Sequence, residues 1–287
     1  MSPHPLPLPR LERREVGERP QDLLVMHTDE GLFASAGIRI GFTERGPIAD
    51  SPFSGLNLSA TVDGDEGAAR AAIRRLCAVV GATEDRTIRP RQVHGTHLVT
   101  ASSEASLPDA MDGAAEGADG VVVTAPDVAA LLCFADCAPV IIASPSGSFA
   151  VAHAGWRGAV AGIAGDAARA LAAQDAARGA FPSAEAAAQG CNAYIGPCIH
   201  GECFEVGPDV RDRFVERFGR ACAPDEAHVD LVRAVRVDLK RAGIPSERIA
   251  VLDACTACEP DRFFSYRACG GTCGRHGAIA CRPTEGG

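Results

Sequence analysis

The sequence predicts one domain of mixed helices and strands, with a sheet that is covered on its faces. Several apolar runs are continuous rather than alternating, which is typical of strands buried on both faces. Between these runs lie segments with apolar residues at helical spacing. No internal repeat and no linker divides the 287 residues, and a chain of this length can bury a sizeable core.

The individual elements are predicted from these patterns in chain order. The expected strands are residues 37–43, 87–94 with extended chain through 100, 118–124, 128–134, 149–152, 194–199 and 249–253. The expected helices are residues 65–80, 159–172, 209–218 and 229–242, the first of them ended by Gly81. The Ala-rich residues 173–190 either extend a helix or form a surface excursion.

The N-terminal segment, residues 1–22, is rich in Pro, Arg and Glu and has no apolar signal-peptide core. We expect a flexible tail there, followed by a single domain over residues 23–287. No apolar stretch approaches the ~20 residues of a membrane span, and we expect a cytoplasmic monomer without membrane contact. The formal net charge of −9 argues against a nucleic-acid-binding surface, which would need a basic stripe.

Twelve cysteines are many for this length. An even count could indicate disulfides, but the chain length and the lack of a signal peptide favour reduced thiols, some of them metal ligands. Cys255 and Cys258 have C-x-x-C spacing, and Cys269, Cys273 and Cys281 follow. This group is either a structural zinc site or a set of small buried hydrophobic residues.

Three residues form a candidate catalytic metal centre. Cys137 follows the apolar run 128–134, His153 follows the run 149–152, and His94 lies upstream before Gly95. Strand ends present side chains to a cleft, and one thiolate with two imidazoles suits zinc and leaves a fourth position open. Copper accepts the same ligands, and each residue taken singly could instead be structural.

Two polar neighbours each have two interpretations. Asp136 either orients a ligand histidine as an outer-sphere partner or caps a turn. Arg157, in the segment 155–158 (GWRG), either binds an anion, since a guanidinium matches phosphate geometry, or forms a surface ion pair.

Six segments occur in an order that matches a known family. They are residues 92–95 (QVHG), 135–140 (ADCAPV), 153–158 (HAGWRG), 195–199 (IGPCI), 204–207 (FEVG) and 263–267 (FFSYR). Together they resemble the YfiH-like laccase-domain family, whose members are also called multicopper polyphenol oxidases or peptidoglycan editing factors. The resemblance covers about residues 38–275, most of the chain.

The resemblance implies an α+β fold, a single-domain layered α/β/β/α sandwich similar to the catalytic domain of cytotoxic necrotizing factors. It also implies zinc, or copper, at His94, Cys137 and His153, which would be the catalytic residues. The implied substrates are purine nucleosides and phosphate, with phosphorolysis of adenosine, inosine or methylthioadenosine and deamination of adenosine. Older family names imply copper-dependent phenol oxidation, and other members are linked to amide hydrolysis in cell-wall precursors.

Two further substrate-binding residues are implied by the resemblance alone. Arg45 lies in a segment similar to one that places an arginine at the substrate phosphate, although residues 46–50 depart from the usual Gly-Gly-Val-Ser. Asn57 matches a position near the site. Residues 268–271 replace the basic and acidic residues usual in the family, so a different substrate preference is expected.

Four hypotheses therefore compete. The first is a zinc-dependent purine nucleoside phosphorylase with adenosine deaminase activity. The second is an amide hydrolase with Cys137 as nucleophile and His153 as base, acting on peptidoglycan precursors. A multicopper oxidase would need more histidines than the eight present, and a non-catalytic metal-binding protein is the fourth. Loss of activity on chelation favours the first, and loss on alkylation alone favours the second.

Overall fold

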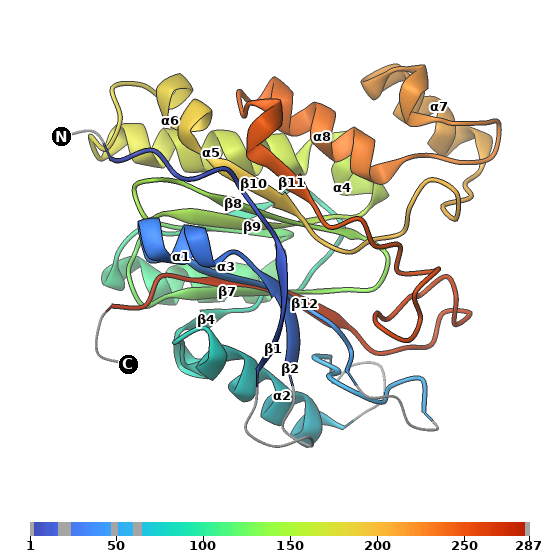
Figure 1. The fold of residues 1–287 in the computed structure, drawn as a ribbon, viewed down its shortest axis with the longest axis horizontal. Coiled ribbons are helices and arrows are strands. Elements are labelled where there is room, and N and C mark those ends of the chain that lie inside the picture. Colours follow the sequence, from blue (N-terminus) through green and yellow to red (C-terminus); the bar gives the residue numbers. More distant parts are fainter. Residues whose placement is uncertain (1–2, 17–23, 47–50, 60–64, 285–287) are drawn as a thin grey trace.

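The computed structural model describes residues 3–16, 24–46, 51–59 and 65–284. Two six-stranded sheets lie face to face, with helices on the outer side of each (Figure 1). This confirms the α+β layered sandwich. In the described part of the chain, no helix combines the length and the apolar character that crossing a membrane requires.

The first sheet has the strand order β1-β2-β3-β12-β7-β4. Its strands are β1 (Glu12–Val16), β2 (Leu24–Thr28), β3 (Arg39–Thr43), β12 (His276–Cys281), β7 (Ala129–Phe134) and β4 (Thr87–Ile88). Its outer face packs on α2 (Glu66–Val79), where Asp65 caps the helix by accepting a hydrogen bond from the Ala68 amide at 2.8 Å.

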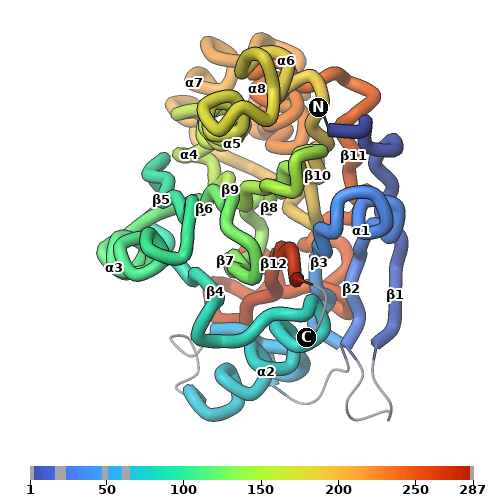
Figure 2. Tube along the Cα trace, turned by 90° about the vertical axis from the view of Figure 1, so that its left-hand side faces the viewer, coloured from blue at the N-terminus to red at the C-terminus, as the bar shows by residue number. Residues whose placement is uncertain are grey.

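The second sheet has the order β11-β10-β8-β9-β6-β5. Its strands are β11 (Ile249–Val251), β10 (Asn192–Ile195), β8 (Ala138–Ala143), β9 (Phe149–Ala154), β6 (Gly120–Val123) and β5 (Leu98–Ala101). Five helices lie on its outer side, namely α4 (Trp156–Ala161), α5 (Ile163–Ala177), α6 (Ala184–Gly190), α7 (Pro208–Phe218) and α8 (Leu231–Arg241) (Figure 1). The helices α1 (Glu30–Ala36) and α3 (Leu107–Gly117) flank the layers (Figure 2). Single 3-10 turns occupy Glu84–Arg86, Glu104–Ser106, Arg220–Cys222 and Ser246–Arg248.

The central strands are continuous apolar runs because both of their faces are buried. Along β8, Val140 and Ile142 belong to the core under the helices, whereas Ile141 and Ala143 belong to the core between the two sheets. The inter-sheet core also takes residues from β3, β7 and β12. One shared core joins both sheets, which supports our proposal of a single domain.

The N-terminal segment differs from the expected flexible tail over the residues that the structure describes. β1 pairs antiparallel with β2, and Leu6 is 4% exposed in the inter-sheet core. β1 is an edge strand, so its charged side chains face solvent and its composition does not look like that of a strand. Residues 1–2 and 17–22 lie outside the described part.

Several predicted boundaries shift for local reasons. The strand expected at residues 87–94 ends at Ile88, before Arg89 and Pro90, and the one at 194–199 ends before Gly196 and Pro197. The helix expected at 159–172 begins at Trp156 and is broken at Gly162, whose φ of +100° is left-handed. Residues 173–190 both extend α5 and form α6. The strands β1, β2, β8 and β12 and the helices α1 and α3 were not predicted.

Candidate metal centre

The structure brings His94, Cys137 and His153 together. Their ligand atoms all lie within 4.8 Å of one another, although the residues come from three separate segments. Cys137 lies in the turn between β7 and β8, and His153 lies near the end of β9. Because β8 pairs with β9 and Ala138 lies opposite Ala154, the turn carries Cys137 to the histidine. His94 is exposed, Cys137 is half-buried and His153 is buried.

Two residues at the centre have strained backbone conformations. His94 has a φ of +60° and Asp136 a φ of +84°, both in the left-handed region that non-glycine residues rarely adopt. Strain of this kind persists where surrounding contacts impose it, and it gathers at functional sites. One strained residue is thus a candidate ligand itself, and the other, Asp136, directly precedes the candidate ligand Cys137.

Asp119 holds the two histidines in place. This carboxylate, fully buried before β6, accepts hydrogen bonds from the amides of Val93 (3.2 Å), His94 (2.9 Å) and Gly95 (2.6 Å). It also lies 2.8 Å from His153 Nδ1. The role of Asp119 was not predicted from the sequence. Its position directly before the apolar residues 120–123, where a buried charge needs partners, was the available signal.

Asp136 has a different role. Its Oδ1 accepts a hydrogen bond from Thr256 Oγ1 at 2.7 Å, and its Oδ2 accepts one from the Arg267 amide at 2.7 Å. Of the two interpretations of Asp136, these contacts favour the structural one. Its carboxylate holds the segments that contain Thr256 and Arg267. Asp119, not Asp136, is the carboxylate that contacts the ring of a candidate ligand histidine, His153.

Glycines allow this close packing. A Cβ on Gly155 would lie 2.9 Å from His94 Cδ2 and 3.0 Å from Cys137 Sγ, and one on Gly158 would lie 2.9 Å from the Gly95 carbonyl oxygen. A side chain at Gly155 would therefore press on His94 and Cys137, and one at Gly158 would press on the backbone next to His94.

The electrostatics favour a thiolate at Cys137. Burial alone would raise the pKa of this thiol, but the charge of His153 and hydrogen bonds from both histidines lower it to about 6. Burial likewise opposes charge on His153, yet the Cys137 thiolate and Asp119 raise the pKa of His153 to about 9. The thiolate is the form that binds metals.

A cavity of about 740 Å³ opens over the three residues. Its described lining includes five arginines, which are Arg89, Arg91, Arg157, Arg267 and Arg275, and three aromatic residues, which are Trp156, Phe204 and Tyr266. The cavity is thus basic within a chain whose formal net charge is −9. Its size fits a small molecule, and its charge fits an anion.

Arg157 lies in this cavity, with its guanidinium carbon 4.3 Å from the centre of the Trp156 ring. It forms no ion pair with any described residue, so the surface ion pair considered from the sequence is not found there. Arg275 is less available to bind an anion than Arg157. Its guanidinium already donates hydrogen bonds to the carbonyls of Cys273 at 2.7 Å and Gly274 at 2.9 Å.

The two residues implied only by the resemblance lie outside the described lining of the cavity. Arg45 is buried, and its guanidinium donates to the Pro260 carbonyl at 3.1 Å and the Ser54 carbonyl at 3.3 Å. Asn57 Oδ1 accepts a hydrogen bond from the Arg275 amide at 2.9 Å. Asn57 therefore contacts a cavity residue, whereas Arg45 is bonded to backbone away from the cavity.

Comparison with known proteins gives a consistent result. The family described as multi-copper polyphenol oxidoreductase laccase matches residues 39–282. The purine nucleoside phosphorylase YlmD of Geobacillus stearothermophilus is 32% identical over 85% of this chain and 89% of its own length. The adenosine deaminase RL5, from an unknown prokaryotic organism, is 32% identical over 83% of this chain and 92% of its own.

Solved structures agree in fold. YlmD from Geobacillus stearothermophilus superposes with a TM-score of 0.75 at 30% identity, covering 90% of this chain and 96% of that one. The YfiH protein of Bacillus licheniformis also gives a TM-score of 0.75, at 26% identity over 89% of this chain and 96% of its own. This chain therefore belongs to the multi-copper polyphenol oxidoreductase laccase family, the YfiH-like family that its motifs resemble.

Proposed function

We propose that the protein is a zinc-dependent purine nucleoside phosphorylase that also deaminates adenosine. The observation that carries the proposal is the convergence of His94, Cys137 and His153 at a cavity lined by arginines and aromatic rings. The names of its relatives, which include phosphorylases and an adenosine deaminase, support the same reactions. We expect the protein to act as a cytoplasmic monomer.

The donor set fits a single catalytic zinc ion. Two imidazoles and one thiolate are three ligands of the kinds that zinc prefers, and three protein ligands leave one position open. Asp119 supplies the outer-sphere carboxylate that usually fixes a ligand histidine. Among the described residues, which include all eight histidines, only His94 and His153 belong to a group of three close ligands. This favours one metal ion over a multicopper centre, although copper accepts the same three ligands.

The cavity arginines would bind phosphate. Arg157 has its guanidinium without a described ionic partner, and guanidinium groups bind phosphate through paired hydrogen bonds. In phosphorolysis a phosphate oxygen forms a bond to the ribose anomeric carbon, the glycosidic C–N bond breaks, and the departing base takes up a proton. Arg157 would hold the phosphate and offset its charge as it approaches the sugar.

The aromatic residues would bind the base. Trp156 and Tyr266 both line the cavity, and stacking on aromatic rings is the usual way that proteins hold a nucleobase. In deamination, water replaces the amino group of the adenine ring and ammonia leaves. When bound, the metal would supply a Lewis acid that activates water, while Asp119 keeps His153 in the tautomer that presents Nε2.

One observation favours a second candidate, the Cys/His amide hydrolase. Cys137, His153 and Asp119 form a thiol, imidazole and carboxylate series of the kind that activates a cysteine nucleophile. The lowered pKa of the Cys137 thiol is consistent with a nucleophilic role as well as with metal binding. The substrates would then be amides of peptidoglycan precursors.

The test is release of free base from adenosine and inosine by zinc-loaded protein, with and without phosphate and with and without chelator. We expect release that needs phosphate and stops on chelation. No release from protein with verified metal, together with alkylation-sensitive cleavage of a peptidoglycan precursor, would replace this proposal with the amide hydrolase.

A further inference from the structure

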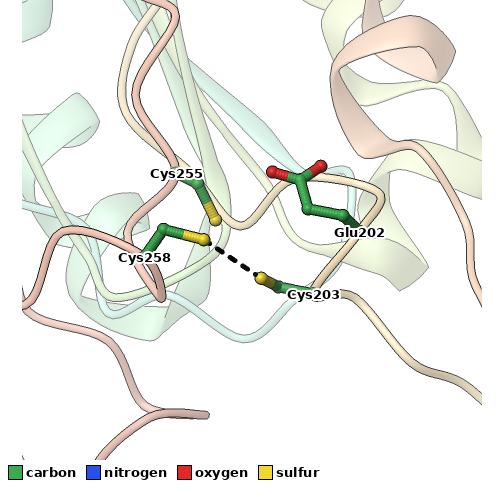
Figure 3. Close-up of side chains that lie close together, drawn as sticks. All are labelled: Glu202, Cys203, Cys255 and Cys258. Atoms are coloured by element: carbon green, nitrogen blue, oxygen red, sulfur yellow. Dashed lines mark hydrogen bonds between the residues drawn. The ribbon is translucent and has the colours of Figure 1, made fainter.

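We propose that Glu202, Cys203, Cys255 and Cys258 form a second metal site that binds a structural zinc ion. Their ligand atoms all lie within 4.8 Å of one another (Figure 3). Three thiols and one carboxylate would supply four ligands of kinds that zinc accepts and would leave no position open, as in structural zinc sites. Thiolate-rich sets also select zinc over magnesium or calcium.

Two tight turns carry the four ligands. The Cys203 amide donates to the His200 carbonyl at 3.0 Å, and the Cys258 amide donates to the Cys255 carbonyl at 3.2 Å. The second turn is the C-x-x-C segment noted in the sequence. A backbone bridge between Cys198 and Cys255 places the turns side by side.

One thiol of the site is already held in place. Cys255 is 5% exposed, and its Sγ accepts a hydrogen bond from the His200 amide at 3.4 Å. Hydrogen bonds to a ligand sulfur are a common outer-sphere feature of metal sites. Glu202 and Cys258 are exposed, so an ion can enter from solvent.

The arrangement suits a metal better than a disulfide. Cys203 Sγ lies 3.3 Å from Cys258 Sγ, whereas a disulfide bond is about 2.05 Å long. A disulfide would use two of the thiols and leave Cys255 and Glu202 facing it without a role. The other cysteines of the C-terminal group are separate, since Cys269, Cys273 and Cys281 are not among the four ligands.

The site would brace one wall of the catalytic cavity. Phe204, which lines the cavity, directly follows Cys203. Thr256, between Cys255 and Cys258, donates to Asp136, which adjoins Cys137. A metal here would tie both segments together. Metal binding itself is independent of the proposed function, and only its effect on turnover rests on that function.

The test is the zinc content of purified protein after dialysis against metal-free buffer containing a reductant. Binding would release the thiol protons to the buffer. Cys258→Ser is expected to hold one zinc ion fewer per chain than wild type, as is Cys203→Ser. The matched control Cys269→Ser removes an exposed thiol outside the site and should keep the wild-type content. His94→Ala should lose only the ion of the catalytic centre.

Cobalt gives a second readout. With Co²⁺ in place of zinc, Cys258→Ser should lose most of the thiolate-to-cobalt absorption, because this site would supply three of the four ligating thiols. Unchanged zinc content in both Cys258→Ser and Cys203→Ser would overturn the proposal, as would a Cys203–Cys258 disulfide in protein purified without reductant. Wild-type protein that holds the second ion but releases no base would overturn the proposed function alone.

Discussion

The two cysteine-containing ligand groups of this molecule differ in how they are built. The proposed catalytic group, His94, Cys137 and His153, combines strained backbone, a buried carboxylate partner and an open cavity. The second group, Glu202, Cys203, Cys255 and Cys258, lies on two tight turns, and none of its residues lines that cavity. Three ligands with an opening suit chemistry, whereas four ligands without one suit structure. The predictions below separate these two roles.

The largest effect is expected when a catalytic ligand is removed. Cys137→Ala leaves two histidines to hold the metal, so we expect loss of the ion and a fall in base release of more than about 100-fold, beyond the effect of outer-sphere changes. Zinc content and base release measured on the same sample check this. Base release within a few-fold of wild type would show that Cys137 is not a ligand of the catalytic metal.

Thiol reactivity should also separate the two groups. In metal-free protein the pKa of Cys137 is lowered to about 6. A hydrogen bond with Cys203 lowers the pKa of Cys258, but the neighbouring Cys255 thiol, burial and the charge of Glu202 together outweigh it, so the pKa of Cys258 is raised. The Cys137 thiolate is therefore present above about pH 6 and is lost as the pH falls through 6. At pH 7 we expect iodoacetamide to modify Cys137 roughly tens of times faster than Cys258.

Mass spectrometry of the labelled peptides between pH 5 and 9 measures both rates in one sample, and zinc should protect both cysteines. A Cys137 rate that rises only above pH 8 would contradict the thiolate assignment.

Loss of the outer-sphere carboxylate should have the next largest effect. In Asp119→Asn, the amide NH₂ would face backbone N–H groups that now donate to a carboxylate. We expect zinc affinity or base release to fall about 10–100-fold. Asp112→Asn, at an exposed position on α3, is the control and should behave as wild type. Wild-type affinity in Asp119→Asn would show that His153 needs no such partner.

A phosphate-specific effect is expected at Arg157. Arg157→Gln removes a charge-assisted hydrogen bond worth about 1.5–3 kcal/mol, so the KM for phosphate should rise roughly 10-fold or more while the nucleoside KM changes little. Arg169→Gln, on the outer side of α5 where Arg169 pairs with Asp166, is the control. Equal changes in both KM values would show a structural role instead.

The smallest catalytic effect is expected at the second group. Cys258→Ser should lower the Tm by a few degrees, on the scale of about 1 kcal/mol, and change base release only a few-fold. If Cys258→Ser lost as much base release as Cys137→Ala, catalysis would depend on the second group, contrary to the roles assigned to the two groups. Addition of excess zinc should raise the Tm of wild type more than that of the variant.

Much of the fold, and two of the three candidate metal ligands, could be predicted from the sequence, because local pattern determines where they lie. The strands β3 and β9 and the helix α2 follow apolar runs or helical spacing, and Cys137 and His153 lie near the ends of such runs. β1 could not be predicted, because an edge strand with charged side chains has no apolar run.

The partners of the ligands could not be predicted, because only the tertiary fold brings them close. Asp119 lies more than thirty positions from His153, and Cys203 is more than fifty from Cys258. The C-x-x-C pair was visible in the sequence, but its actual companions, Glu202 and Cys203, lie in an upstream turn rather than among the cysteines that follow it.

The most direct measurement of the central claim is a zinc titration of chelator-stripped protein, comparing wild type with Cys258→Ser. Bound zinc and phosphate-dependent base release from inosine are followed together. We predict that base release in Cys258→Ser rises in proportion to zinc and saturates at one ion per chain, the ion at His94, Cys137 and His153. Base release that is full without zinc, or that never appears when this centre is loaded, would contradict the account.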